Sequence, residues 1–224
     1  MPVCALVGAT DFNEEHFLSQ HFDSVIAVDA GYAHLARVGV EPRAIVGDFD
    51  SLGYVPEAGC VKRYPAEKDQ SDMELALRLA LERGFDTIVV YAALAGRLDH
   101  TLANIQVMAA YARRGACVFG VGDSFVLAVL DGAGFSRLRF DAFDPSMLDA
   151  GEYGRFVSAF ALGGCARGVC ESGLKYSLAG ADVPFGVSLG LSNEFTGEPA
   201  QISVSEGSVV VTFSLGAWNF LKGC

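Results

Sequence analysis

Two aspartates separated by one residue offer the clearest chemistry in this sequence. Asp48 and Asp50 lie in "GDFDS", residues 47–51, directly after the apolar run "AIV" of residues 44–46. In an extended chain, side chains two residues apart leave on the same face, so these two carboxylates would repel each other at close range. We therefore expect a positive group between them.

Further carboxylates follow the other apolar runs of the first half. Asp29 ends "SVIAVD", and Asp99 follows "TIVVYAAL" through a Gly-Arg turn, while Asp69 and Asp72 lie in "KDQSD" at the start of a predicted helix. Ligands of an open parallel sheet bind beyond the carboxyl ends of the strands, which is where these acids fall. Oxygen ligands without a nearby histidine or thiolate suit Mg²⁺, which also keeps substrate phosphates in its shell.

Each of these aspartates also has a simpler explanation when it is taken alone. Asp99 could cap the helix that follows it, and Asp72 could complement the dipole of its own helix. Capping does not explain the pair at Asp48 and Asp50, and "GDFDS" together with "KDQSD" in one fold favours a metal site.

The segment "AGRLDHTLAN", residues 95–104, adds groups that could bind phosphate. Its glycine allows close backbone approach, and Arg97 could contact phosphate with two parallel hydrogen bonds. With Lys68, these groups could clamp a polyphosphate. Alternatively, Arg97 pairs with a neighbouring acid and His100 packs against its own helix; His100 is still the one histidine with a functional prediction.

The elements that must position these residues follow from periodicity. In the first half, short apolar runs alternate with helical segments expected at about 14–21, 32–38, 72–83 and 101–114, which is typical of a mostly parallel sheet covered by helices. Ser71 with Glu74 three residues later forms a capping box for the third helix. After about residue 131, glycine becomes frequent and short β-branched or aromatic runs replace helical periodicity. We predict an α/β domain over residues 1–131, followed by an antiparallel sandwich or barrel over residues 132–224.

Composition limits the classes of function. The 224 residues are 51% hydrophobic and 19% charged, with a net charge of -11 and no lysine and arginine cluster, which argues against a nucleic-acid partner. The first residues lack the basic region of a signal peptide, and no stretch is long enough for a membrane span, so we expect a cytoplasmic protein without a membrane partner. The six cysteines are scattered without a C-x-x-C pair. In "CARGVC", residues 165–170, neighbouring strand positions are a commoner explanation than a redox pair.

The motifs of several other enzyme classes are missing. The sequence has no P-loop, no G-x-G-x-x-G and no G-x-S-x-G, which removes the main support for a Walker-type ATPase, a dinucleotide oxidoreductase or a serine hydrolase. Phosphoryl transfer by positioning and electrostatic stabilisation, with Mg²⁺ carrying charge, needs only the residues described above.

Taken together, the motifs resemble those of the thiamine pyrophosphokinase family. The stretches that carry the resemblance span nearly the whole chain in the family's order: "VDAGYAHLARVGVEPRAIVGDFDS", "KDQSDMELAL", "GRLDHTLANI", "SGLKYSL" and "LSNEF". The resemblance implies an α/β domain followed by a β-sandwich, in a homodimer that holds thiamine at its interface. It also implies that the thiamine hydroxyl attacks the β-phosphorus of ATP, so that pyrophosphate moves as a unit and AMP leaves.

The resemblance also assigns residues to the site. It implies that Asp48, Asp50, Asp72 and Asp99 are catalytic, and that Asp48, Asp50 and Asp72 also bind Mg²⁺. It implies that the nucleotide and phosphates are handled by Asp29, Lys68, Asp69, Ser71, Arg97, Asp99 and His100, and that thiamine is bound by Tyr176, Ser192 and Asn193. Asp99 and Asp72 are both possible acceptors of the thiamine hydroxyl proton. An aromatic ring over the cationic thiazolium is a reasonable cation–π contact.

The chain departs from the family pattern at three places. Ala95 stands where paired glycines are common, Ser71 replaces the usual threonine but keeps the hydroxyl, and "GATDF" replaces a glycine-glycine turn after the first strand. Trp218 in the tail is expected in the sandwich core or in dimer packing.

Three alternative functions remain open at the level of sequence. The enzyme could use another alcohol acceptor, the protein could be a thiamine or nucleotide sensor without turnover, or "DFDS" could supply an aspartyl nucleophile to a Mg²⁺-dependent phosphoesterase. Transfer of pyrophosphate from ATP to thiamine explains more of the motifs than any of these.

Overall fold

The computed structural model describes residues 2–49, 54, 60–65, 67–148 and 151–222. It is a mostly β protein with few helices, and its strands form both parallel and antiparallel pairs. Contacts divide the chain into two compact units. The first comprises residues 1–107 with 120–123, and the second comprises residues 108–119 with 124–224. The domain boundary predicted after residue 131 stays a prediction.

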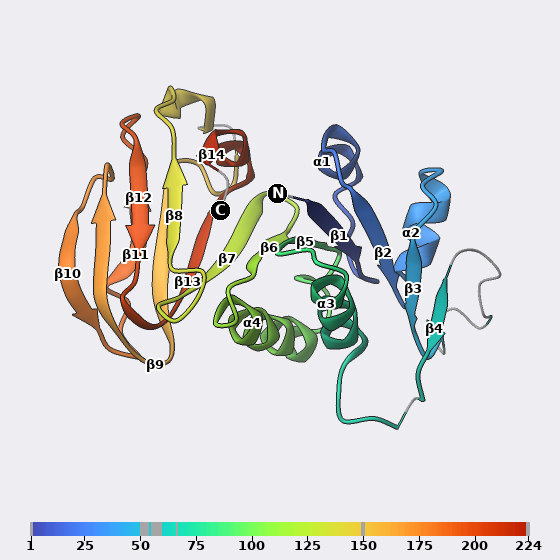
Figure 1. The fold of residues 1–224 in the computed structure, drawn as a ribbon. Coiled ribbons are helices and arrows are strands. Elements are labelled where there is room, and N and C mark those ends of the chain that lie inside the picture. Colours follow the sequence, from blue (N-terminus) through green and yellow to red (C-terminus); the bar gives the residue numbers. More distant parts are fainter. Residues whose placement is uncertain (1, 50–53, 55–59, 66, 149–150, 223–224) are drawn as a thin grey trace. The chain divides into compact units, whose positions relative to one another are not determined.

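Parallel strands form the sheet of the first unit. Their order is β5-β1-β2-β3-β4 (Figure 1), with bounds β1 Val3–Val7, β2 Ser24–Val28, β3 Ala44–Gly47, β4 Val61–Arg63 and β5 Thr87–Tyr91. Most residues of β1, β2, β3 and β5 are buried, as expected for strands that are covered on both faces. Because all pairs are parallel, the carboxyl ends of these strands lie at one edge of the sheet.

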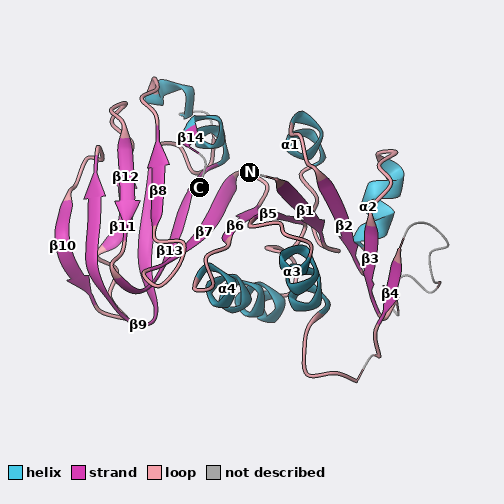
Figure 2. Cartoon of the chain, viewed as in Figure 1, coloured by secondary structure: helices cyan, strands magenta, loops and turns pink. Residues whose placement is uncertain are grey.

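Helices follow these strands (Figure 2): α1 Glu14–Ser19, α2 Gly31–Arg37, α3 Asp72–Glu82 and α4 Leu98–Ala112. The Ser71 hydroxyl caps α3 by accepting a hydrogen bond from the Glu74 backbone N–H at 3.2 Å, as the capping box predicts. The buried face of α3 contacts β1, β2 and β3. The fourth helix begins at Leu98 rather than near Thr101, so Asp99 and His100 lie within its first turn.

Gly31, the first residue of α2, packs directly against the end of β1. A Cβ atom at this position would lie 1.9 Å from the Val7 carbonyl oxygen and 2.6 Å from that of Gly8. Only glycine permits this approach. The contact brings the start of α2 against the edge of the sheet where the strands end.

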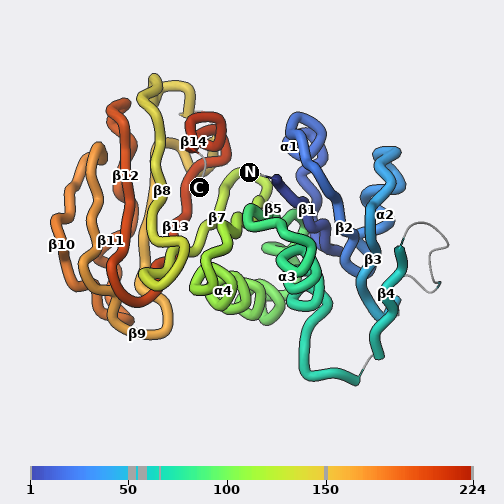
Figure 3. The backbone as a smooth tube through the Cα atoms, viewed as in Figure 1, coloured from blue at the N-terminus to red at the C-terminus, as the bar shows by residue number. Residues whose placement is uncertain are grey.

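The strands β7 to β14 of the second unit form antiparallel pairs. Their order is β14-β8-β12-β9-β13-β7, with β10 and β11 also paired to β9, and the bounds are β7 Phe125–Asp131, β8 Arg137–Phe140, β9 Phe156–Ser172, β10 Leu178–Val183, β11 Gly190–Glu194, β12 Ala200–Ser203, β13 Glu206–Ser214 and β14 Leu221–Lys222. The first half of β9 pairs with β11 and β13, and its second half with β10 and β12 (Figure 3). The strand β6 (Cys117–Val121) contains residues of both units. Short 3₁₀ helices span Pro145–Leu148 and Leu215–Phe220.

Aromatic side chains form the core of the second unit. The ring of Phe140 lies 5.0 Å from the rings of both Phe195 and Phe213, and all three side chains are almost fully buried. Trp218 packs edge-on against Phe119 at 5.3 Å, so its ring contributes to packing within this unit. Both roles expected for Trp218, in the sandwich core or in dimer packing, stay predictions.

Two further findings concern the predictions on cysteines and membranes. Cys4, Cys60, Cys165 and Cys170 are free thiols, so the two cysteines of "CARGVC" do not form a disulfide here. Within the part of the chain that the structure describes, each helix is too short or too polar to cross a membrane.

Candidate functional site

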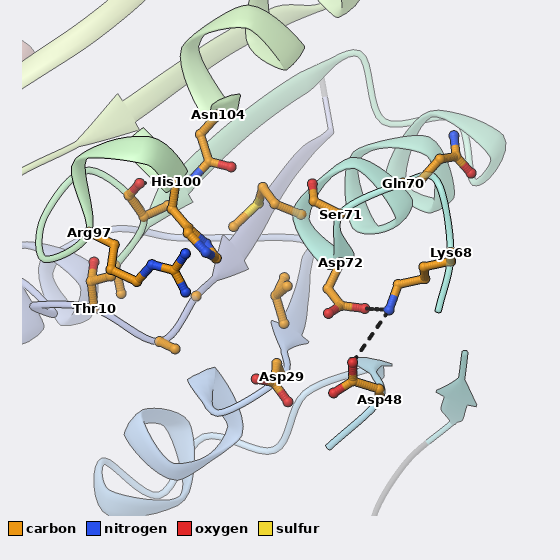
Figure 4. Close-up of a pocket in the computed structure, with 16 residues that line it drawn as sticks. Thr10, Asp29, Asp48, Lys68, Gln70, Ser71, Asp72, Arg97, His100 and Asn104 are labelled. Atoms are coloured by element: carbon orange, nitrogen blue, oxygen red, sulfur yellow. Dashed lines mark hydrogen bonds and ion pairs between the residues drawn. The ribbon is translucent and has the colours of Figure 1, made fainter. Parts of the chain in front are cut away.

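A cavity of about 490 Å³ opens in the first unit, beside the carboxyl ends of β1, β2, β3 and β5 and the starts of α3 and α4 (Figure 4). The cavity is lined by Gly8, Ala9, Thr10, Val28, Asp29, Asp48, Lys68, Gln70, Ser71, Asp72, Met73, Ala92, Ala93, Arg97, His100 and Asn104. The strand ends converge here because the sheet is parallel. Its position is therefore the one that the sequence predicts for a ligand site.

Lys68 supplies a positive charge between two of the predicted acids. Its Nζ lies 3.1 Å from Asp72 Oδ1 and 3.6 Å from Asp48 Oδ2, and all three side chains are at most 21% exposed. Figure 4 shows the ammonium pointing between the two carboxylates. Lys68 also donates a hydrogen bond to the Pro65 carbonyl oxygen at 3.1 Å. Asp50, the partner of Asp48 in the sequence argument, lies outside the described residues.

Asp29 adds a third carboxylate at the end of β2. Its Oδ1 is buried and finds no hydrogen-bond partner among the residues that the structure describes. Gly47 makes room for it, because a Cβ at residue 47 would lie 3.0 Å from the Asp29 Cα. A buried carboxylate oxygen without a donor is costly unless a cation or a ligand satisfies it.

The backbone is strained where three of the parallel strands end. Asp29 after β2, Phe49 after β3 and Ala92 after β5 have φ values of 49°, 66° and 52°. Residues with side chains rarely adopt such values, and strain of this kind is concentrated at functional sites. The strain turns the chain sharply as it leaves the sheet, next to the cavity.

The acids influence one another electrostatically. Burial raises the pKa of Asp72 above its ordinary value, the ion pair with Lys68 opposes this rise, and the charges of Asp48 and Asp29 add to it. Desolvation and like charge therefore both favour binding of a cation at this cluster.

The predicted magnesium site has only partial support in the described residues. Among them, no group of three or more His, Cys, Asp and Glu side chains is arranged closely enough to hold a metal. The oxygen ligands themselves suit Mg²⁺, since Asp29, Asp48 and Asp72 offer hard oxygen atoms. Asp29 Oδ1 has no hydrogen-bond donor among the residues that the structure describes.

Arg97 lies at the start of α4 and lines the cavity, but it is paired with an acid. Its Nη2 and Nε donate to the two carboxylate oxygens of Asp99 at 2.6 and 3.2 Å, and both side chains are largely exposed. This bond is the main cause that lowers the pKa of Asp99. The structure therefore contains the ion pair of the alternative interpretation, in which Arg97 pairs with a neighbouring acid.

Most of the predicted nucleotide and phosphate residues line the cavity. Asp29, Asp48, Lys68, Ser71, Asp72, Arg97 and His100 do so. Asp69 and Asp99 are exposed and are not among the lining residues. The individual roles of all of these residues stay predictions.

The three predicted thiamine residues lie together in the second unit. The Tyr176 ring is 63% exposed, and the Lys175 Nζ lies 5.6 Å from its centroid. Asn193 is buried, and its side-chain oxygen accepts a hydrogen bond from the Tyr176 backbone N–H at 2.9 Å. Ser192 has a φ of 57°, and its backbone N–H donates to the Ser158 hydroxyl at 3.0 Å.

Comparison with known proteins identifies the family. The model described as "Thiamin pyrophosphokinase, catalytic domain" matches residues 16–119, and the model described as "Thiamin pyrophosphokinase, vitamin B1 binding domain" matches residues 146–209. The chain belongs to the thiamin pyrophosphokinase family. It is therefore an enzyme of the transferase class, as the resemblance in the sequence indicated.

Individual relatives agree with this assignment to the thiamin pyrophosphokinase family. The chain is 29% identical over 210 residues to the thiamine pyrophosphokinase of Bacillus subtilis, and the match covers 90% of this chain and 89% of the relative. The crystal structure of the thiamin pyrophosphokinase from Geobacillus thermodenitrificans matches with a TM-score of 0.76 and 27% identity, covering 95% of this chain and 97% of that one. The enzyme from Candida albicans shares the fold, with a TM-score of 0.74 at 17% identity over 95% of this chain and 88% of that one.

Sequence reasoning missed several residues of the cavity. Thr10, Gln70 and Asn104 line it, and Asn104 donates to the Ala93 carbonyl oxygen at 2.8 Å from its buried side chain. Gln70 and Asn104 lie within motifs typical of thiamin pyrophosphokinases, so their position in those motifs was a usable signal. Thr10 lies before the segment matched by the catalytic-domain model, and only the end of β1 points to it.

Proposed function

We propose that this protein catalyses the Mg²⁺-dependent transfer of pyrophosphate from ATP to thiamine, giving thiamine diphosphate and AMP. Membership of the thiamin pyrophosphokinase family supports pyrophosphate transfer to thiamine, with ATP as the implied co-substrate. The observation that carries the proposal for this chain is the position of Lys68 between Asp48 and Asp72, in a cavity where parallel strands end and α3 begins.

The residues of the cavity suit a polyphosphate. The partial positive charge at the N-terminus of α3 attracts anions, and backbone N–H groups of a first helical turn point toward such ligands. Lys68 and Arg97 add two cationic side chains that line the same cavity. An incoming phosphate competes with Asp99 for the Arg97 guanidinium, because both offer oxygen atoms to the same planar set of donors.

Mg²⁺ completes this proposal. Asp29, Asp48 and Asp72 would hold the ion, together with Asp50 on the sequence argument, and the unpartnered Oδ1 of Asp29 supports that choice. When bound, Mg²⁺ supplies charge stabilisation to the transferred group. The remaining task of the protein is to position the thiamine hydroxyl in line with the β-phosphorus.

In this proposal, the residues that bind thiamine belong to the second unit. The exposed ring of Tyr176 offers an aromatic face to the cationic thiazolium. Asn193, which follows Ser192 in the sequence, is hydrogen-bonded to the Tyr176 backbone. We further propose that residues 1–131 form the α/β catalytic domain and residues 132–224 a β-sandwich. The parallel pairing of the first sheet and the antiparallel pairing of the second support this division.

A homodimer is also part of the proposal. Phe185, Val187, Leu189 and Leu191 alternate along one segment and are each between 45% and 67% exposed. A contiguous series of exposed apolar side chains is unfavourable in water and usually marks an interface. A second copy of the chain is the partner that the family resemblance implies.

Separation of the reaction products tests the proposed function. With thiamine, ATP and Mg²⁺ we expect thiamine diphosphate and AMP in equal amounts, measured by ion-exchange chromatography. Formation of ADP would contradict the transfer of pyrophosphate as a unit. Binding of thiamine without turnover would favour a sensor, and a phospho-enzyme trapped by rapid quenching would favour the aspartyl phosphoesterase.

A panel of other alcohol acceptors tests the choice of substrate. We expect thiamine to be turned over with the highest kcat/KM. A better acceptor would overturn thiamine as the substrate while leaving the pyrophosphoryl chemistry intact.

A further inference from the structure

Glu171 is a buried carboxyl group on β9, and none of the site predictions uses it. Its side chain is 3% exposed, and it follows Val169 by two residues, so both point to the same buried face. The strand is flanked there on both sides, because Glu171 is opposite Leu178 of β10 and Ile202 of β12. An apolar residue would be expected at this position.

The carboxyl group receives little compensation for its burial. Its Oε2 accepts a hydrogen bond from the Asn193 side-chain amide at 2.6 Å, while Oε1 is buried with no hydrogen-bond partner among the described residues. Burying such a group costs free energy, and an apolar side chain of similar size often gives a more stable protein. Stability therefore does not explain Glu171, whereas control of the Asn193 orientation does.

Asn193 uses all of its hydrogen-bonding capacity within the protein. The amide nitrogen donates to Glu171 Oε2 and to the Tyr176 carbonyl oxygen at 2.7 Å, and the amide oxygen accepts from the backbone N–H groups of Tyr176 and Glu194, both at 2.9 Å. An amide has two N–H donors and two favourable acceptor directions, so the set is complete. If the amide were rotated by 180°, its oxygen would face two acceptor oxygens and its nitrogen would face two N–H donors, so all four hydrogen bonds would be lost.

Asn193 thereby holds both main-chain polar groups of Tyr176 with a single side chain. The Tyr176 ring remains exposed, although its peptide groups are tied to a buried amide. Lys175 is also restrained, because its Nζ forms an ion pair with Glu194 Oε1 at 2.5 Å. Residues 175 and 176 are thus held by contacts with residues 193 and 194.

We propose that Glu171 is a positioning residue for thiamine: it selects the orientation of the Asn193 amide, which fixes the main chain of Tyr176 and so sets the place of the Tyr176 ring. This inference rests on the proposed function, since it takes Tyr176 to be the aromatic residue that covers thiamine. In this proposal, Asn193 holds the main chain of Tyr176. The polar atoms of the Asn193 side chain are already hydrogen-bonded within the protein.

Steady-state kinetics of two Glu171 variants tests the proposal. Glu171→Leu keeps the volume but removes the acceptor, and we expect the KM for thiamine to rise about tenfold, the change that about 1.4 kcal/mol produces. The KM for ATP should change less than about twofold on the same scale. Glu171→Gln keeps a carbonyl oxygen for Asn193 and should retain the KM of the wild type for thiamine.

Asp131 provides a matched control in the same unit. It is equally buried, at 3% exposure, and accepts hydrogen bonds from the Ala133 backbone N–H and the Ser208 hydroxyl, which have no link to Asn193. Asp131→Leu should lower the melting temperature without a selective rise of the KM for thiamine.

The outcomes separate this inference from the proposed function. An unchanged KM for thiamine in Glu171→Leu, or an equal rise of both KM values, would overturn the positioning role. If Glu171→Leu does not fold, Glu171→Gln decides, because a folded Gln variant with a tenfold higher KM for thiamine would contradict the proposal. A wild-type protein that neither binds nor converts thiamine would overturn the proposed function and this inference together.

Discussion

At the scale of single residues, Lys68 joins two of the acids that line the cavity. Its ammonium group contacts Asp48 and Asp72 at distances that allow attraction to both, in side chains that are about four-fifths buried. Partial burial strengthens such attractions relative to bulk water. The arrangement indicates that these two carboxylates are stabilised by a positive charge, which Lys68 provides.

Removing one carboxylate of this cluster tests its role in turnover. We expect Asp48→Asn or Asp72→Asn to lower kcat by about 100-fold, the usual effect of losing one charge-stabilising contact in a transition state. AMP release measured at saturating thiamine and ATP reports the change. Glu82→Gln removes a carboxylate from the exposed far end of α3 and should leave kcat within about twofold. Full activity of both asparagine variants would remove the metal and phosphate assignment.

The buried Glu171 predicts how stability depends on pH. Burial raises its pKa, against the lowering effect of the Asn193 hydrogen bond, so the folded state binds this proton more tightly than the unfolded state. The free energy of unfolding should therefore fall as pH rises from the ordinary glutamate pKa of about 4.3 to the raised value in the folded state. Glu171→Gln cannot lose a proton, so its stability relative to the wild type should increase over this window. Urea unfolding at a series of pH values measures the difference, and a difference that does not depend on pH would contradict the shift.

At the scale of elements, the ends of the parallel strands determine where the site lies. The strands β2, β3 and β5 each leave the sheet through a residue with positive φ, and α2 and α3 start close by. Short turns of this kind bring Asp29, Asp48 and Ala92 to one rim of the sheet. Close backbone contacts, rather than long side chains, set these positions.

Gly31 tests the importance of those close contacts. In Gly31→Ala, the added Cβ would meet the carbonyl oxygens of Val7 and Gly8, which belong to the backbone and cannot move aside without displacing β1. We expect the free energy of unfolding to fall by about 3 kcal/mol, measured by urea denaturation. In Gly164→Ala the added Cβ has no atom within 4 Å, and stability should change by less than about 0.5 kcal/mol. Equal stability of the two variants would show that the contact at Gly31 can relax.

At the scale of the whole molecule, the exposed apolar segment predicts self-association. Light scattering after size exclusion should give a particle of twice the chain mass of 23.7 kDa. Leu189→Glu places a charge in the exposed series and should yield monomers, because a buried unpaired charge is costly at an interface. Leu18→Glu changes an exposed leucine of α1 and should leave the dimer intact. A monomeric wild type would remove the homodimer from the proposal.

Sequence patterns predicted those features that depend on neighbours along the chain. Ser71 and Glu74 marked the start of α3, and apolar runs marked the strands of the first unit, because capping and burial are read over a few residues. The start of α4 was predicted three residues late, at about Thr101 instead of Leu98. Residues 97–100 are mostly polar, so the apolar pattern of a helix is not visible in the first turn. The motif spacing also indicated the thiamin pyrophosphokinase family, which the family models confirm.

The choice of residues that reach the cavity required the tertiary structure. Asp69 and Asp72 lie three residues apart, yet only Asp72 lines the cavity, because it begins α3 whereas Asp69 precedes the helix. Likewise, Arg97 reaches the cavity while Asp99, two residues later, lies in the exposed pair. Such differences depend on the direction of each side chain at the end of its element.

The sequence alone indicated the kinds of elements and the family, and it predicted the chemistry of the acidic motifs. Only the tertiary structure decided that Lys68 contacts both Asp48 and Asp72, and that Glu171 is buried against Asn193, 22 residues further along the chain. The physical reason is that local pattern specifies which face of an element is apolar, whereas contacts between distant residues depend on strand register and on the angles at which the chain leaves the sheet.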